Sequence, residues 1–185
     1  IVYFISTKIL RSRGIGPTII ISPLLSLIRN QSEAARKLGL SIASINSTNT
    51  DDHDSIIERL KSNTLDVLII SPEQLANEGR FRRIQENITQ LGLFVVDEAH
   101  CISDWGHDFR PDYRRIIDYV TMLPKNIPVL ATTATANDRV VDDVSAQLGK
   151  IDVIRGPLTR DSLRIKTIKI KDSAERLAWL ALNVP

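Results

Sequence analysis

Two adjacent carboxylates and a histidine follow a run of apolar residues in the middle of the chain. The run covers Leu91–Val96, and Asp97, Glu98 and His100 come directly after it. An aspartate at the end of a buried strand is where nucleoside triphosphatases hold Mg²⁺. A neighbouring glutamate can orient or deprotonate the attacking water. The pattern therefore favours Mg²⁺-dependent hydrolysis of a nucleoside triphosphate, with His100 placed to relay a contact to another element.

Three further polar clusters also follow apolar runs. They are Ser22-Pro23, Ser71-Pro72 and the threonine-rich segment 132–135. Ligands of open parallel sheets bind beyond the carboxyl ends of the strands, so the four clusters together predict one binding edge. Taken singly, each Ser-Pro pair is better explained as a helix cap.

Short apolar runs alternate with amphipathic helical patterns along the chain. The alternation predicts an α/β fold with a mostly parallel sheet and helices on both faces. The predicted strands are Thr18–Ser22, Ser41–Asn46, Asp66–Ser71, Leu91–Asp97, Ile127–Thr132 and Ile151–Arg155. The apolar spacing predicts helices around residues 1–10, 24–38, 56–60, 81–88, 111–120, 140–148 and 173–182.

Composition excludes several classes of protein. The 185 residues are 43% apolar and 25% charged with a net charge of +2, which is typical of a globular domain and permits a nucleic-acid partner without requiring one. The single cysteine, Cys101, excludes an intramolecular disulfide framework and suits a reducing compartment. The apolar start of the chain is too short for a membrane-spanning helix, which needs about twenty residues.

Residues 97–113, DEAHCISDWGHDFRPDY, closely resemble motif II and the aromatic-rich loop of the RecQ family of DNA helicases. Three other stretches resemble motifs of that family in the right order: IIISPLLSLIRNQ, LIISPEQL and ATTATANDRVVDDVSAQLG. The likeness spans about residues 1–165, and RNA helicases with DEAD or DEAH boxes lack a WGHDFRP segment. The resemblance implies the first RecA-like lobe of an ATP-driven DNA motor.

The resemblance also implies a role for each matching residue. Asp97 corresponds to the Mg²⁺–ATP ligand, Glu98 to the residue that activates water, and His100 to the link with motif III. The residues implied to couple hydrolysis to DNA are Thr133, Thr135, Trp105, His107, Asp108, Phe109 and Arg110. The residues implied to contact DNA are Ser22, Pro23, Ser71, Pro72, Trp105 and Phe109.

One motif of the family does not occur: the 185 residues contain no G-x-x-x-x-G-K-[ST] segment, which would cradle the phosphates. We therefore expect the chain to begin just after that loop, so that residues 1–155 form a partial ATP-binding lobe. Residues 156–185 are then a linker and the start of the second lobe, with an edge strand and C-terminal helix of the same domain as the alternative. ATP and Mg²⁺ are not expected to bind tightly to the chain alone.

The sequence leaves two classes of function open. The first is an ATP-dependent DNA helicase that unwinds duplex DNA in the 3′ to 5′ direction during recombination or repair, inside the cell and away from membranes. The second is a helicase relic that binds nucleic acid or a protein partner without hydrolysis. A zinc site at His100, Cys101, Asp104 and His107 matches no standard ligand spacing and is disfavoured. Nothing in the sequence indicates an oligomeric state.

Trp105 provides a test of the loop's implied role. In the full-length protein, Trp105→Ala should sharply reduce the stimulation of ATP hydrolysis by single-stranded DNA. Loss of one stacked base costs about 1–3 kcal/mol of DNA affinity, so some DNA binding should survive. If Trp105 is instead a core anchor, its removal should cost about 3–5 kcal/mol of stability. A thermal melt beside the stimulated ATPase assay distinguishes the two, and a collapsed melting temperature would remove Trp105 from the site.

Overall fold

The computed structural model describes residues 1–48, 53–75, 77–88, 90–103, 111–149, 151–156 and 167–183. The chain divides into two compact units, Ile1–Asp152 and Val153–Pro185. The first unit holds the whole sheet, and the second holds a single helix, α8, over Ser173–Asn183. What the second unit belongs to stays a prediction.

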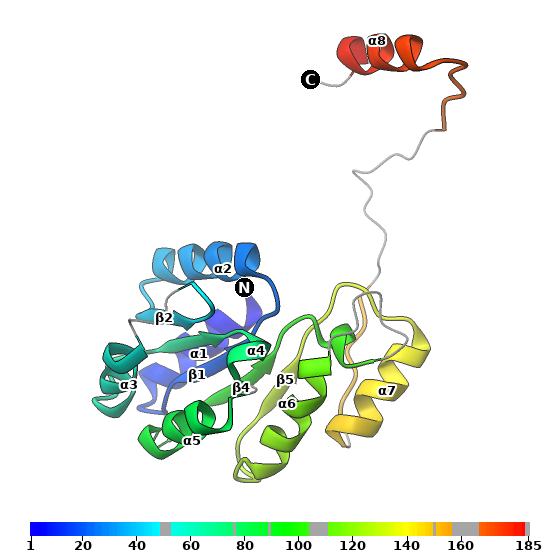
Figure 1. Ribbon diagram of the computed structural model, residues 1–185. Coiled ribbons are helices and arrows are strands. Elements are labelled where there is room, and N and C mark those ends of the chain that lie inside the picture. The colour runs from blue at the N-terminus through cyan, green and yellow to red at the C-terminus, as the bar shows by residue number, and fades with distance from the viewer. Residues whose placement is uncertain are drawn as a thin grey trace. The chain divides into compact units, whose positions relative to one another are not determined.

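A parallel sheet of five strands forms the centre of the first unit (Figure 1). The strand order is β2-β3-β1-β4-β5, and each neighbouring pair is parallel. This confirms the predicted fold class. The strands are β1 (Thr18–Ile21), β2 (Ile42–Ile45), β3 (Val67–Ile70), β4 (Leu93–Val96) and β5 (Val129–Ala131).

Helices connect the strands and cover both faces of the sheet (Figure 1). Asn77 and Asn137 begin two of them, each accepting a backbone N–H with its side-chain oxygen. Gly149 ends the helix that Asn137 begins, with φ 87°, a value that costs glycine little. The helices of this unit are α1 (Val2–Ser12), α2 (Leu25–Lys37), α3 (His53–Lys61), α4 (Pro72–Leu75), α5 (Glu78–Asn87), α6 (Pro111–Met122) and α7 (Asp138–Leu148), with the 3₁₀ helix η2 (Ala99–Ile102).

Successive residues of each strand belong to different cores. In β1, Ile20 packs with α1 and α2, whereas Ile19 and Ile21 pack with the helices of the other face. In β4, Val95 likewise belongs to the core beneath α1 and α2, and Val96 belongs to the core on the other face. This period of two explains why the strands are almost wholly apolar, since both of their faces are buried.

The predicted strand Ile151–Arg155 is wrong, because the structure has no strand there. Ile154 is 98% exposed and Val153 is 54% exposed, so these side chains do not lie on a covered sheet. Apolar alternation indicates a strand only where a neighbouring strand is available to pair.

A matched pair of isoleucines tests the two-layer core. Ile20 is fully buried, and Ile154 is almost fully exposed. In the 185-residue chain, Ile20→Ala should lower the free energy of unfolding by about 2–5 kcal/mol, because it removes buried carbons and leaves a cavity. Ile154→Ala, the same chemical change, should alter it by less than about 0.5 kcal/mol. Urea unfolding followed by circular dichroism measures both, and equal losses would contradict the described packing.

Candidate functional site

Three polar residues lie side by side where β1, β4 and β5 end. The Asp97 amide donates to the Ile21 carbonyl at 2.9 Å, and the Thr132 amide donates to the Val96 carbonyl at 2.9 Å. The hydrogen-bond ladder of the parallel sheet therefore continues one residue past each strand. It places Ser22, Asp97 and Thr132 at equivalent positions after the three neighbouring strands. The predicted convergence of polar clusters at one edge is thus observed for these three strands.

The Asp97 carboxylate is held from two sides. Its Oδ1 accepts a hydrogen bond from the Thr132 hydroxyl at 2.7 Å. Its Oδ2 accepts one from the side-chain amide of Gln31 in α2 at 2.5 Å. The Tyr113 hydroxyl of α6 also donates to the Asp97 backbone carbonyl at 2.9 Å. The acid that ends β4 is therefore fixed by α2, α6 and the end of β5 together.

Glu98 has a left-handed backbone, with φ 51° and ψ 46°. A non-glycine residue in this region is strained, and such strain concentrates at functional sites. The turn comes directly after Asp97, and η2 starts immediately after it. Partial burial and the nearby charge of Asp97 raise the pKa of Glu98, and His100 lowers it by a smaller amount. A raised pKa makes this carboxylate a stronger base.

His100 links Glu98 to the segment after β5. Its Nδ1 lies 3.2 Å from Glu98 Oε2 and 2.9 Å from the Thr133 hydroxyl. Because a carboxylate only accepts hydrogen bonds, Nδ1 carries the proton when it faces Glu98. Thr133 Oγ1 in turn accepts from the Thr135 amide at 3.1 Å. One ring nitrogen is therefore shared between the acid after β4 and the threonines after β5.

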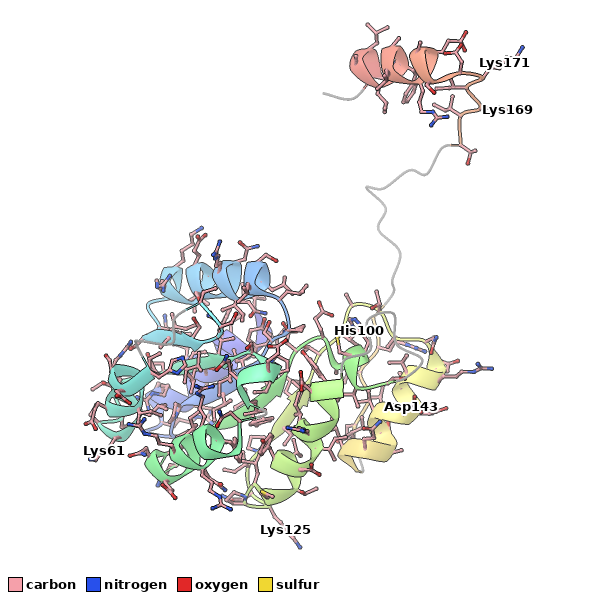
Figure 2. All side chains as sticks on the ribbon, in the orientation of Figure 1. Lys61, His100, Lys125, Asp143, Lys169 and Lys171 are labelled. Atoms are coloured by element: carbon pink, nitrogen blue, oxygen red, sulfur yellow. The ribbon has the colours of Figure 1, made fainter. Side chains whose placement is uncertain are left out.

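A second connection joins η2 to α7. The Ser103 hydroxyl, fully buried, donates to Asp143 Oδ2 at 2.5 Å. Figure 2 shows Asp143 on α7 and His100 on η2, on the same side of the first unit. The segment of η2 and Ser103, which follows the carboxylates, is thus tied both to Thr133 after β5 and to α7.

The comparisons with known proteins agree with this geometry. Residues 2–144 match the DEAD/DEAH box helicase family. The chain belongs to that family. It is 40% identical over 159 residues to the ATP-dependent DNA helicase RecQ of Bacillus subtilis, covering 83% of this chain and 26% of that protein. It is 37% identical over 181 residues to the RecQ-like DNA helicase BLM of Xenopus laevis, covering 92% of this chain and 13% of that protein. The RecQ resemblance is confirmed.

Two solved structures share the fold. The Hef helicase domain of Pyrococcus furiosus matches 72% of this chain and 27% of its own, with a TM-score of 0.50 and 20% identity. The yeast DEAD-box splicing factor Prp28 matches 74% of this chain and 32% of its own, with a TM-score of 0.51 and 23% identity. At these identities the likeness concerns the architecture of the helicase domain alone.

Four of the six residues predicted to contact DNA are described by the structure, and these four are buried. Ser22, Pro23, Ser71 and Pro72 all lie beneath the surface. Ser22 Oγ has no hydrogen-bond partner among the described residues. The DNA-binding role of these four residues stays a prediction. Five predicted coupling residues, Trp105, His107, Asp108, Phe109 and Arg110, and the candidate zinc ligand Asp104 lie outside the described residues.

Several residues around Asp97 were given no role of their own by the sequence analysis. Thr132 belongs to the polar cluster 132–135 that was predicted at this edge, and the register of β4 and β5 is what places it opposite Asp97. Gln31 and Tyr113 reach Asp97 from helices, and sequence spacing contains no signal for either contact. Tyr3 of α1 completes the group, since its hydroxyl accepts from the Gln31 amide at 3.1 Å. Burial, followed by the charge of Asp97, raises the pKa of Tyr3 to about 12.

An apolar cavity of about 620 Å³ opens at the opposite edge of the sheet. Its lining includes Ile15 and Leu91, which precede β1 and β4. It is therefore separate from the carboxylates, which follow the strands. None of the described helices is long and apolar enough to cross a membrane.

Glu98 should destabilise the folded helicase domain when it is ionised. Its pKa is raised in the folded state, so the unfolded chain loses this proton first as the pH rises, and stability falls. Glu98→Gln should therefore raise the melting temperature of the 185-residue chain at pH 7–8. The gain should vanish below about pH 4, where Glu98 is protonated in both states.

The control is Glu33→Gln, which removes the same charge from an exposed position of α2. Melting temperatures of the three proteins across this pH range provide the comparison. A Glu98→Gln variant that melts lower than the wild type at pH 7–8 would contradict the electrostatic account. A gain equal to that of Glu33→Gln would mean that net charge alone is responsible.

Proposed function

We propose that this chain supplies part of the first RecA-like motor lobe of an ATP-dependent DNA helicase of the RecQ type. Residues 1–155 form the lobe, and residues 156–185 form a linker and the start of the second lobe. The chain spans about a quarter or less of the curated relatives quoted above, so the activity belongs to the whole protein. The names of those relatives support DNA as the substrate and ATP as the fuel.

The arrangement of Asp97 is the observation that carries the proposal. Its carboxylate is clamped between Thr132 and Gln31 at the carboxyl edge of the sheet, and Glu98 stands beside it. Each clamped oxygen retains a lone pair for a further partner. A rigid, half-buried acid at this edge has little structural purpose of its own, whereas it suits the binding of a nucleotide cation.

The donor set fits Mg²⁺. This ion prefers oxygen ligands, keeps several waters and is bound through one or two carboxylates together with substrate phosphates. No group of three or more metal-ligating side chains occurs in the part of the chain that the structure describes, which agrees with a cation that arrives with ATP. Asp97 would hold it, with Glu98 nearby. When bound, Mg²⁺ neutralises charge on the phosphates and on the leaving group.

Glu98 then serves as the base. Its carboxylate accepts a proton from the water that attacks the γ-phosphoryl group of ATP, and the raised pKa favours this transfer. Nδ1 of His100 lies within reach of both Glu98 and Thr133, so it can orient Glu98 and sense the position of Thr133. We infer that motion of Thr133 and Thr135 on DNA binding reaches Glu98 by this route, together with the loop from Trp105 to Arg110.

The remaining assignments rest on the RecQ likeness. We propose 3′ to 5′ unwinding in recombination or repair, within the compartment that holds the DNA. Ser22-Pro23 and Ser71-Pro72 would shape the DNA-facing edge through their backbone, since their side chains are buried. The 185 residues contain no phosphate-binding G-x-x-x-x-G-K-[ST] segment, so we expect the chain alone to hydrolyse ATP at background rate. A full-length protein equally inactive with ATP and DNA would favour the non-catalytic relic.

The two carboxylates should separate into two roles in the full-length protein. Glu98→Gln should abolish hydrolysis and leave Mg²⁺-dependent nucleotide binding largely intact, because only the base is lost. Asp97→Ala should weaken that binding as well, because the cation loses its protein ligand. Phosphate release and binding of a fluorescent ATP analogue, each with and without Mg²⁺, measure the split. Glu33→Gln is the control, and equal loss of nucleotide affinity in both site variants would overturn the assignment.

A further inference from the structure

Gln31 occupies an unusual position for a neutral side chain of a long surface helix. It lies in α2, is 9% exposed and meets the site about 66 residues away in sequence. Its Nε2 donates to Asp97 Oδ2 at 2.5 Å and to the Tyr3 hydroxyl at 3.1 Å. One amide group therefore joins α1, α2 and the acid at the end of β4.

The chemistry of the partners fixes the orientation of this amide. An ionised carboxylate only accepts hydrogen bonds, so Nε2 faces Asp97, and the reverse orientation would set Oε1 against a negative charge. The two hydrogens of Nε2 are then both used. Gln31 Oε1 is buried and has no hydrogen-bond partner among the described residues. A buried acceptor in this condition is unfavourable unless another group donates a hydrogen bond to it.

A water molecule bound to a cation is a suitable hydrogen-bond donor for Gln31 Oε1. A magnesium ion keeps several of its waters, and each of them donates strongly. Gln31 Oε1 belongs to the same amide that donates to Asp97. Ser22 Oγ, which also lacks a hydrogen-bond partner among the described residues, follows the neighbouring strand β1. Both atoms are therefore satisfied most readily when hydrated Mg²⁺ is at Asp97. Thr132 holds one carboxylate oxygen and Gln31 holds the other, so loss of Gln31 would leave the carboxylate fixed at a single oxygen.

We propose that Gln31 is a positioning residue for magnesium, which holds Asp97 in the orientation that receives the hydrated cation of Mg²⁺–ATP. The inference rests on the proposed function. Partners that orient metal ligands typically contribute 10–100-fold in metal affinity. Gln31 acts through Asp97 rather than on ATP itself, so its loss should weaken the response to Mg²⁺ more than the maximal rate.

The test compares Gln31→Leu with two matched variants in the full-length protein. Gln31→Leu keeps the approximate volume and removes both polar ends. Tyr3→Phe breaks only the contact between Tyr3 and the amide, and leaves the bond to Asp97. Gln85→Leu makes the same chemical change at an exposed position of α5. Should Gln31→Leu fail to fold, Gln31→Met gives a more flexible apolar replacement of similar length.

Two measurements are made on each variant. The first is the Mg²⁺ concentration at half-maximal ATPase activity, with the maximal rate at saturating Mg²⁺. The second is Mn²⁺ binding in the presence of ADP, followed by the electron paramagnetic resonance signal of free Mn²⁺. For Gln31→Leu we expect the half-maximal Mg²⁺ concentration and the Mn²⁺ dissociation constant to rise about 10-fold or more. The maximal rate should recover most of its wild-type value. Gln85→Leu should stay near wild type, and Tyr3→Phe should have a smaller effect than Gln31→Leu because the bond to Asp97 remains.

The outcomes separate the inference from the proposed function. A Gln31→Leu protein that melts lower but keeps the wild-type response to both cations would overturn the positioning role and leave Gln31 as a structural contact. A Tyr3→Phe effect as large as that of Gln31→Leu would transfer the role to the α1 contact and likewise overturn it. A wild-type protein without Mg²⁺-dependent hydrolysis would overturn the proposed function and this inference with it.

Discussion

The parallel pairing of β4 between β1 and β5 is the constraint on which the site depends. The ladder bonds continue for one residue beyond the strands: the Asp97 amide donates to the Ile21 carbonyl on one side, and the Thr132 amide donates to the Val96 carbonyl on the other. A shift of one residue in either pairing would turn the Asp97 side chain to the other face of the sheet. The burial of every residue of β1 and β4 disfavours such a shift, because a slip of one residue would exchange the two apolar faces of the strand.

The same constraint explains which features could be read from the sequence. The strands around Ile20, Ile69 and Val95 are apolar on both faces, so their existence and their parallel pairing were predictable. Asp97 and Glu98 were predictable because their residue types and position suffice. The absence of a strand at 151–155 was not predictable. The apolar residues there resemble those of a true strand, and only the lack of a neighbouring strand distinguishes them.

Contacts that cross the fold could not be predicted in this way. Gln31 reaches Asp97 because α2 covers the face of the sheet to which Ile20 and Val95 also belong. No periodicity within α2 marks Gln31 apart from its buried neighbours Ile28, Ser32 and Ala35. Tyr113 has the pattern of a core residue and is fully buried, yet its hydroxyl ends on the Asp97 carbonyl. A polar atom on a buried side chain needs a partner, but the sequence does not say which one.

Asp97 and Glu98 are neighbours in sequence, but they are connected to opposite sides of the sheet. Gln31 and Tyr3 tie the Asp97 carboxylate to the layer of α1 and α2. His100 ties Glu98 to η2, which packs with α6 and α7 in the other layer. The left-handed turn at Glu98 makes this division possible, because it directs the second acid away from the first within a single peptide unit. If Glu98 is the base and Asp97 the cation ligand, as proposed above, the side chains of the two acids take their contacts from different layers of the fold. The left-handed backbone and the raised pKa of Glu98 both disfavour the folded state, which is the cost expected of a functional residue rather than of a structural one.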